Sequence, residues 1–334
     1  MKCVAIGDMM IPTRYFKKEL EKSSFISEFL CRPWKEDLNK DEFREVIRKI
    51  ETEGSDAYDP GVEITKLMKE AEIIFVHQCP VNKDVIDHAK NLKYILSCRG
   101  GVENIAMDAA NKKGIKVINC PVHNAYAVAE YTIGLILNEL RNISRACTAL
   151  KKGEWRERYL NSATLTEMRS QTIGIIGFGT IGRLVVERLK GFHPRILVND
   201  PFADKELIHQ EGCEYVTKEE LIKRSDVVTI HARIDAEDPP IIGKMEFDQM
   251  KKTAYLINTA RAIAVDMEAL YEALSKHKIM GAAIDVFPTE PVPKDNPLLN
   301  LDNITVTNHQ GGATIESYIK APEMVLNMLN QIIK

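Results

Sequence analysis

Four polar residues in the second half of the chain have side chains that can orient an anion and transfer a proton. Arg261, Asp285 and His309 each stand just past an apolar, strand-like run, and Glu290 lies in the turn-rich segment after Asp285. In a parallel α/β sheet the carboxyl ends of the strands share one edge, where ligands bind. The spacing therefore predicts that these side chains gather at one sheet edge.

Together these residue types suit hydride transfer between a 2-hydroxy acid and a 2-keto acid. Arg261 offers a planar fork that can orient a carboxylate and a carbonyl. His309 can give a proton to the new hydroxyl group, or take it in the reverse direction. Glu290 would orient the imidazole and stabilise its protonated form. Taken singly, each has a plainer alternative as a surface ion-pair residue, a structural histidine or a solvated acid, but the combination favours catalysis.

A nucleotide-binding turn precedes these residues. The apolar run Thr172–Ile176 leads into Gly177-Phe178-Gly179-Thr180-Ile181-Gly182, and a helical pattern follows. The first glycine permits the tight turn, the second lets the backbone approach a pyrophosphate, and the third lets helix and strand pack closely. The start of the helix then offers free N–H groups to the phosphates. The pattern predicts a dinucleotide site that contains Gly177, Gly179, Thr180, Ile181 and Gly182.

Asp200 indicates which dinucleotide binds. It closes the next strand-like run, 18 residues beyond Gly182. A carboxylate at this place can accept hydrogen bonds from the ribose hydroxyls and would repel a 2′-phosphate. The sequence therefore predicts NAD rather than NADP as the cofactor.

The elements that must position these residues follow an alternating pattern. Short apolar runs alternate with helical patterns, which is typical of parallel βαβ units. The predicted strands are Val4–Ile6, Ile73–Val76, Tyr94–Leu96, Lys116–Ile118, Thr172–Ile176, Ile196–Val198, Val227–Ile230, Tyr255–Ile257, Ala282–Ile284 and Ile304–Val306.

Helix ends carry their own signals. Asn39 with Glu42 and Thr217 with Glu220 fit capping boxes, and Asp266 can cap a helix over Met267–Lys278. The longest helical pattern covers residues 124–150 and predicts one helix, able to connect two domains.

With these motifs in this order, the chain resembles the D-isomer-specific 2-hydroxyacid dehydrogenases from about Tyr94 to Thr314. The motifs that carry the resemblance are Ser97-Cys98-Arg99-Gly100-Gly101-Val102-Glu103-Asn104, Asn124-Ala125-Tyr126-Ala127-Val128-Ala129-Glu130, Gly177–Gly182 with Asp200, Asn258-Thr259-Ala260-Arg261, Asp285-Val286-Phe287 with Glu290-Pro291, and His309-Gln310-Gly311-Gly312-Ala313-Thr314.

The resemblance implies an α/β fold with two doubly wound parallel-sheet domains, one Rossmann-like and one flavodoxin-like. A split substrate-binding domain (residues 1–121 and 309–334) would flank an inserted NAD-binding domain (residues 122–308). It also implies a homodimer formed through the NAD domain, with the helix over residues 124–150 at the contact.

The resemblance also implies roles for particular residues. Arg261, Glu290 and His309 would form the catalytic set, with Arg261 and His309 also binding substrate. Backbone N–H groups of Gly100, Gly101 and Val102 would hold the substrate carboxylate. Further cofactor contacts are expected from His231, from Thr259, Ala260 and Asp285 at the nicotinamide amide, and from Gly311 and Gly312.

Composition excludes several other classes. The net charge is −3 and no basic block occurs, so neither nucleic acid nor an anionic membrane is expected as a partner. No apolar stretch is long enough to span a bilayer and no signal peptide is recognisable. The seven cysteines are scattered without a CxxC pair, which favours reduced thiols, no metal site and a cytoplasmic protein.

Two other functions stay open. Members of this fold also act as NAD-sensing binding proteins, including corepressors, and such a protein can keep the same three side chains. Formate dehydrogenases of this fold pair the histidine with glutamine, so Glu290 argues against that activity. The acid itself is not specified by the sequence, because specificity is expected in the loops Asp8–Tyr15 and His77–Pro80. Arg14, Lys17 and Arg99 are cations that could meet a distal phosphate or carboxylate, although solvated surface charges are the plainer interpretation.

Overall fold

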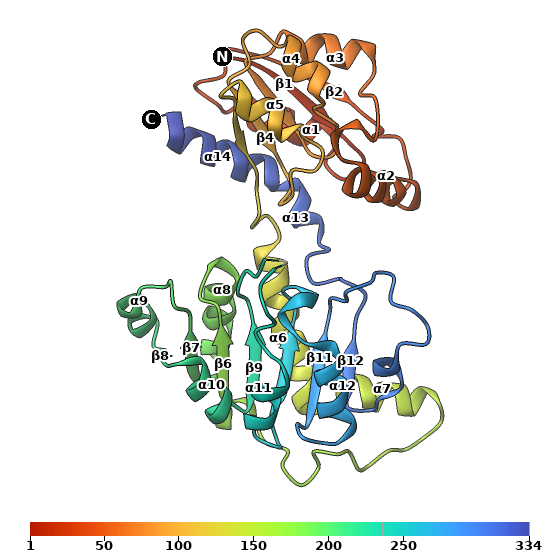
Figure 1. The fold of residues 1–334 in the computed structure, drawn as a ribbon, viewed down its shortest axis with the longest axis vertical. Coiled ribbons are helices and arrows are strands. Elements are labelled where there is room, and N and C mark those ends of the chain that lie inside the picture. Colours follow the sequence, from red (N-terminus) through yellow and green to blue (C-terminus); the bar gives the residue numbers. More distant parts are fainter. Residues whose placement is uncertain (236, 334) are drawn as a thin grey trace. The chain divides into compact units, whose positions relative to one another are not determined.

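Two parallel β-sheets organise the chain in the computed structural model, which describes residues 1–235 and 237–333. The chain divides into two compact units, a first unit of Met1–Asn124 with Thr314–Lys334 and a second unit of Ala125–Ala313 (Figure 1). The second unit is therefore inserted into the first. The sequence analysis had placed these boundaries after residues 121 and 308.

The first unit contains a five-stranded sheet in the order β2-β1-β3-β4-β5. All its strand pairs are parallel, and the order is that of flavodoxin-like folds. Its strands are β1 (Lys2–Gly7), β2 (Glu28–Pro33), β3 (Ile73–Val76), β4 (Tyr94–Ser97) and β5 (Lys116–Ile118).

Helices cover both faces of this sheet. They are α1 (Thr13–Leu20), α2 (Lys40–Glu53), the 3₁₀ turn η1 (Gly54–Asp56), α3 (Val62–Lys69), α4 (Lys83–His88), α5 (Met107–Lys112), α13 (Ile315–Ile319) and α14 (Ala321–Ile333). One face packs against α1 and α14, where Phe16 and Leu329 are fully buried beside Phe75 of β3. The C-terminal helix α14 thus completes a sheet made by the N-terminal part of the chain (Figure 1). The other face packs against α2 to α5.

The second unit contains a seven-stranded parallel sheet in the order β12-β11-β10-β9-β6-β7-β8. This is the Rossmann order with one added strand, and the strand order reverses between β6 and β9. Its strands are β6 (Thr172–Ile176), β7 (Arg195–Asn199), β8 (Glu214–Tyr215), β9 (Val227–Ile230), β10 (Tyr255–Asn258), β11 (Gly281–Ile284) and β12 (Ile304–Val306).

Helices also cover both faces of the second sheet. They are α6 (Ala125–Arg141), α7 (Ile143–Lys151), η2 (Met168–Ser170), α8 (Thr180–Leu189), η3 (Lys190–Phe192), α9 (Lys205–Gln210), α10 (Lys218–Arg224), α11 (Lys244–Gln249), η4 (Ala262–Ala264), α12 (Met267–Ser275) and η5 (Pro297–Asn300). One core lies between the sheet and α6, α8 and α9, and the other lies under α10 to α12. The predicted fold class, with two doubly wound parallel sheets, is confirmed.

All ten predicted strands are present, and both capping boxes form. Asp266 caps α12 by accepting N–H groups of Glu268 and Ala269. The sequence analysis missed β2 and β8. Both are edge strands, and neither has the continuous apolar character by which the buried strands were recognised.

The single helix predicted over residues 124–150 is wrong. The helix breaks at Asn142, which has a φ of 56° and a ψ of 31°, in the left-handed region. Asparagine tolerates this conformation better than most residues. Its side chain donates to Oδ1 of Asn161 at 2.7 Å, and the N–H of Ser144 donates to Oδ1 of Asn138 at 2.8 Å. These side-chain contacts support the break, so α6 and α7 form instead.

Candidate active site

The predicted site residues of the second unit stand at the carboxyl ends of its strands. The glycine-rich turn follows β6, Asp200 follows β7 and His231 follows β9. The remaining residues follow the three strands on the other side of the sheet: Thr259, Ala260 and Arg261 after β10, Asp285 and Glu290 after β11, and His309, Gly311 and Gly312 after β12. Parallel pairing of these strands brings them to one edge.

The glycine-rich turn has no room for side chains at two of its glycines. Gly177 has a φ of +95°, and a Cβ atom there would collide with the backbone of Ala232. A Cβ atom at Gly182 would collide with the carbonyl oxygen of Gly177. At Gly179, by contrast, a Cβ atom would meet nothing within 4 Å. The turn thus packs tightly against the protein and leaves open space at its middle glycine, which fits the close approach of a pyrophosphate.

Asp200 is held against this turn. Its Oδ2 accepts the N–H of Phe178 at 2.7 Å, and its Oδ1 accepts the N–H of Phe202 at 2.9 Å. The carboxylate is only partly buried, so lone pairs remain for a ligand. The glycine turn, the start of α8 and this carboxylate together fit the binding of a dinucleotide.

His231 is a neutral side chain at this edge. Its ring Nε2 and the hydroxyl of Thr229 lie 3.0 Å apart. The backbone N–H of His231 donates to the carbonyl of Ile176 at 2.7 Å. The side chain keeps some exposure, but the protein packed around the ring lowers its pKa to about 3 through burial. At neutral pH the imidazole is therefore uncharged and can contact a ligand only by hydrogen bonding or packing.

The turn after β10 is built by Asn258, which is fully buried. Its Oδ1 accepts the N–H of Ala260 at 3.0 Å, and its Nδ2 donates to the carbonyl of Arg261 at 2.8 Å. The N–H of Ala260 is therefore already used, and the hydroxyl of Thr259 lies 2.9 Å from that of Thr132. The Arg261 guanidinium donates to the carbonyl of Ala260 at 2.8 Å and forms no ion pair with another described residue. Most of its fork is available to a ligand.

Glu290 and His309 form a direct pair. Oε2 of Glu290 lies 2.8 Å from Nδ1 of His309, and Oε1 accepts the N–H of Phe287 at 2.9 Å. Because a carboxylate only accepts, Nδ1 carries the proton in this contact. The His309 side chain is 53% exposed, and the contact leaves Nε2 for a substrate. The carboxylate thus orients the imidazole, and such an arrangement can support proton transfer at Nε2.

Asp285 holds the loop that carries His309. The residue is 1% exposed, and its backbone carbonyl accepts the backbone N–H of His309 at 2.9 Å. Three further donors reach the carboxylate: the hydroxyl of Thr307 at 2.7 Å, the N–H of Gln310 at 2.9 Å and the N–H of Gly311 at 2.8 Å. These contacts anchor the loop that follows β12, and the expectation that Asp285 holds the nicotinamide amide stays a prediction. This positioning contribution was not foreseen from the sequence.

Gly100, Gly101 and Val102 lie in the first unit, in the turn after β4. No described residue accepts a hydrogen bond from their N–H groups. The carbonyl of Gly100 accepts from Nδ2 of Asn119 at 2.5 Å. The turn therefore presents free donors at the carboxyl edge of the five-stranded sheet.

A buried polar network beside this turn was missed by the sequence analysis. Asp8, after β1, is fully buried and accepts the N–H groups of Met10, Ile11 and Gln78. Its Oδ2 also lies 2.9 Å from Nδ1 of His77, after β3. Asn104 donates to the carbonyls of His77 and Cys79 at 3.2 and 3.1 Å. A polar residue directly after a predicted strand is the sequence signal that could have indicated this network. The sequence analysis used that signal only for the second half of the chain.

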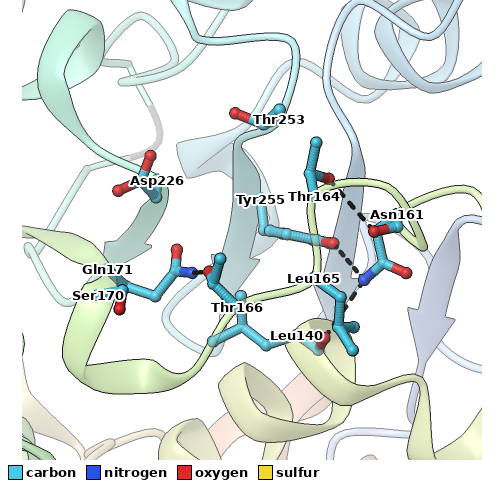
Figure 2. A pocket seen from close by; sticks show the side chains of 10 residues that line it. All are labelled: Leu140, Asn161, Thr164, Leu165, Thr166, Ser170, Gln171, Asp226, Thr253 and Tyr255. Carbon is cyan, nitrogen blue, oxygen red and sulfur yellow. Dashed lines mark hydrogen bonds between the residues drawn. The ribbon is translucent and has the colours of Figure 1, made fainter.

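A pocket of about 240 Å³ lies at the opposite edge of the second sheet. Figure 2 shows residues that line it and that lie where strands begin. Gln171 precedes β6, Asp226 precedes β9, and Tyr255 is the first residue of β10. Its polar groups bond to one another: Asn161 donates to the Tyr255 hydroxyl at 2.8 Å, and Gln171 donates to Thr166. Since ligands of parallel sheets bind at the carboxyl edge, this pocket is not the candidate site.

Two searches of the described ranges found nothing further. Within residues 1–235 and 237–333, no group of three or more His, Cys, Asp or Glu side chains has the arrangement of a metal site. No helix there combines the length and the apolar character that crossing a membrane requires.

The chain is similar to known proteins over most of its length. Residues 133–311 match the model of the NAD-binding domain of D-isomer specific 2-hydroxyacid dehydrogenases. A D-3-phosphoglycerate dehydrogenase from Methanocaldococcus jannaschii is 42% identical over 275 residues, which cover 81% of this chain and 52% of that protein. A hydroxypyruvate reductase from Thermotoga maritima is 35% identical over 284 residues, covering 84% of this chain and 90% of that protein.

Among solved structures, the NAD-complexed D-isomer specific 2-hydroxyacid dehydrogenase from Lactobacillus delbrueckii ssp. bulgaricus has the same fold. Its TM-score is 0.79 at 21% identity, over 100% of this chain and 97% of that one. The chain spans about half the length of the phosphoglycerate dehydrogenases it matches. The family model covers more than half of the chain, including the glycine-rich turn, Asp200, Arg261, Glu290 and His309. The chain therefore belongs to the D-isomer specific 2-hydroxyacid dehydrogenase family.

Proposed function

We propose that this chain is an NAD-dependent dehydrogenase that interconverts a D-2-hydroxy acid and its 2-keto acid. The observation that carries the proposal is the Glu290–His309 pair, with 2.8 Å between Oε2 and Nδ1, at the sheet edge that also bears the dinucleotide turn and Arg261. An oriented imidazole and an unpaired guanidinium at one edge suit proton transfer to a carbonyl oxygen and binding of a carboxylate.

Each residue has a defined part in the proposed reaction. NADH, when bound at the glycine-rich turn, would supply the hydride for reduction of the keto acid. Arg261 binds the substrate carboxylate and carbonyl oxygen. The free N–H groups of Gly100, Gly101 and Val102 are proposed as further donors to a carboxylate. His309, protonated at Nε2, delivers its proton to the oxygen that becomes the hydroxyl group. Glu290 keeps the imidazole in place and balances its positive charge before the proton leaves.

The test of the proposal is oxidation of NADH by the purified chain with a panel of 2-keto acids of different length. Turnover with at least one acid supports a dehydrogenase. Binding of NADH without turnover of any acid would instead favour the alternative, an NAD-sensing binding protein of the same fold.

NADH should be preferred over NADPH. A 2′-phosphate would meet Asp200, which already faces the turn through its contact with Phe178. Two like charges about 4 Å apart cost about 1 to 4 kcal/mol, which corresponds to about five- to a thousandfold in kcat/KM. The measurement compares kcat/KM for the two cofactors in the parent and in Asp200→Asn, in which the preference should shrink. Equal values in the parent would remove Asp200 from the cofactor site.

A homodimer formed through the second unit is also part of the proposal. Its support is a run of exposed apolar side chains on α6, α7 and the segment after them. These are Tyr126, Ile143, Leu150, Trp155, Leu160 and Leu165, with exposed fractions between 46% and 81%. A contact with a second copy of the chain would cover these apolar side chains, as protein–protein contacts do. A monomeric mass by sedimentation equilibrium would contradict the dimer.

A further inference from the structure

A fully buried carboxylate in the first unit has no part in the proposed reaction. Asp8 follows β1, and its Oδ1 accepts the backbone N–H groups of Met10 and Ile11 at 3.0 and 3.1 Å. Its Oδ2 accepts the backbone N–H of Gln78 at 3.0 Å and lies 2.9 Å from the ring Nδ1 of His77. One carboxylate thus joins the segment after β1 to the segment after β3 through four donors.

The segment after β3 in turn holds both ends of the turn after β4. At one end, Nη1 of Arg99 donates to Oε1 of Gln78 at 2.8 Å. At the other end, Nδ2 of Asn104 donates to the carbonyls of His77 and Cys79 at 3.2 and 3.1 Å. Arg99 and Asn104 are both buried, so these hydrogen bonds are shielded from water. The free N–H groups of the turn lie between these two fixed ends.

The contact between Gln78 and Arg99 also affects the charge beside the turn. A Cβ atom at Gly101 would collide with the carboxylate of Glu103, so this carboxylate lies next to the glycine. Its Oε2 is 2.9 Å from Nη2 of Arg99. An unpaired carboxylate here would repel any anion at the free N–H groups. Arg99, held by Gln78, balances that charge and lets the turn accept a carboxylate.

From these contacts, and resting on the proposed function above, we infer that Asp8 is a positioning residue for substrate binding. It fixes the segment after β3, and that segment fixes both ends of the turn whose free N–H groups are proposed to bind the substrate carboxylate. Asp8 acts through Gln78, Arg99 and Asn104 and touches no substrate itself. Because the carboxylate is the same in the substrate and in the transition state, loss of this positioning should weaken substrate binding more than it slows the chemical step.

The test replaces Asp8 with asparagine, which has the same shape but only one accepting oxygen. If that oxygen keeps the N–H groups of Met10 and Ile11, the NH₂ group faces the N–H of Gln78, and the segment after β3 loses its contact with residue 8. The reverse orientation leaves two N–H groups without an acceptor and is less favourable. Asp8→Asn should raise KM for the best acid of the panel about ten- to a hundredfold, while kcat stays within about threefold and the dissociation constant of NADH does not change.

Two further variants accompany this one. Gln78→Met keeps the backbone contact with Asp8 and removes only the acceptor of Arg99, so KM should rise by a smaller factor, about three- to tenfold. This variant decides the inference if Asp8→Asn does not fold. The matched control is Glu139→Gln, which alters an equally buried carboxylate of the second unit that pairs with Arg145. It should keep the parent's KM even where it lowers the temperature of unfolding.

The outcomes separate the two proposals. A folded Asp8→Asn enzyme with the parent's KM overturns the inference while the dehydrogenase function stands. A KM raised as much by Glu139→Gln also overturns it, because the effect would then reflect lost stability. A lower kcat at unchanged KM overturns it too, since Asp8 would then affect the chemical step instead of binding. If no acid of the panel oxidises NADH with the parent, the proposed function fails and the inference fails with it.

Discussion

Replacing His309 with alanine should lower kcat/KM for reduction of a 2-keto acid by about two to four orders of magnitude, the usual contribution of a positioned general acid. Two contacts hold His309 in the structure. Its backbone N–H donates to the carbonyl of Asp285 at 2.9 Å, and its ring Nδ1 lies 2.8 Å from a carboxylate oxygen of Glu290. Alanine removes the proton donor without touching the glycine-rich turn. Binding of NADH, followed by its fluorescence, should therefore change little while turnover is lost.

The control for this variant must account for backbone strain. His309 has a φ of 56°, a conformation that costs alanine about 1 kcal/mol. His277 has a φ of 51° and is exposed, so His277→Ala carries a similar strain away from the sheet edge. It should keep full activity. His309→Asn, which tolerates positive φ, should be as inactive as His309→Ala. Retained activity in His309→Asn would show that strain, and not the lost imidazole, explains the alanine variant.

The sequence predicted the second sheet and its site edge well because both depend on local pattern. Buried strands appear as apolar runs, and the residue after each run is placed at the carboxyl edge by parallel pairing alone. Arg261, Glu290 and His309 could therefore be placed at one edge before any distance was known. The break at Asn142 was missed because its support comes from Asn161, a residue in a following irregular segment.

Contacts between distant segments could not be predicted in the same way. The sequence did not show that the carboxylate of Asp285 accepts hydrogen bonds from Thr307, Gln310 and Gly311 of a later loop. Arg99 looked like a free cation, and only the folded chain brings Glu51 and Gln78 against its guanidinium. In both cases the residue type indicates which interactions the side chain can form. The tertiary contacts determine which groups it meets in the folded chain.

Glu290→Gln should lower kcat about tenfold to a thousandfold, less than for a fully buried orienting acid because His309 and Glu290 are 53% and 38% exposed. The carboxylate accepts two hydrogens at once, from the N–H of Phe287 at 2.9 Å and from Nδ1 of His309 at 2.8 Å. An amide has only one accepting oxygen. If that oxygen keeps the Phe287 contact, the NH₂ group faces Nδ1 and opposes the doubly protonated imidazole. If the amide flips, it places a donor against the N–H of Phe287.

Either orientation of the glutamine thus loses a contact, and the positive charge on His309 loses its counter-charge. The measurement is kcat in both reaction directions together with the dissociation constant of NADH, which should stay within about twofold because Glu290 contacts no group of the glycine-rich turn. Glu290→Asp keeps the charge on a shorter side chain and should recover part of the rate. Glu187→Gln, an exposed change on α8, is the matched control and should behave as the parent does. A Glu290→Gln enzyme with the parent's kcat in both directions would show that His309 works without this carboxylate.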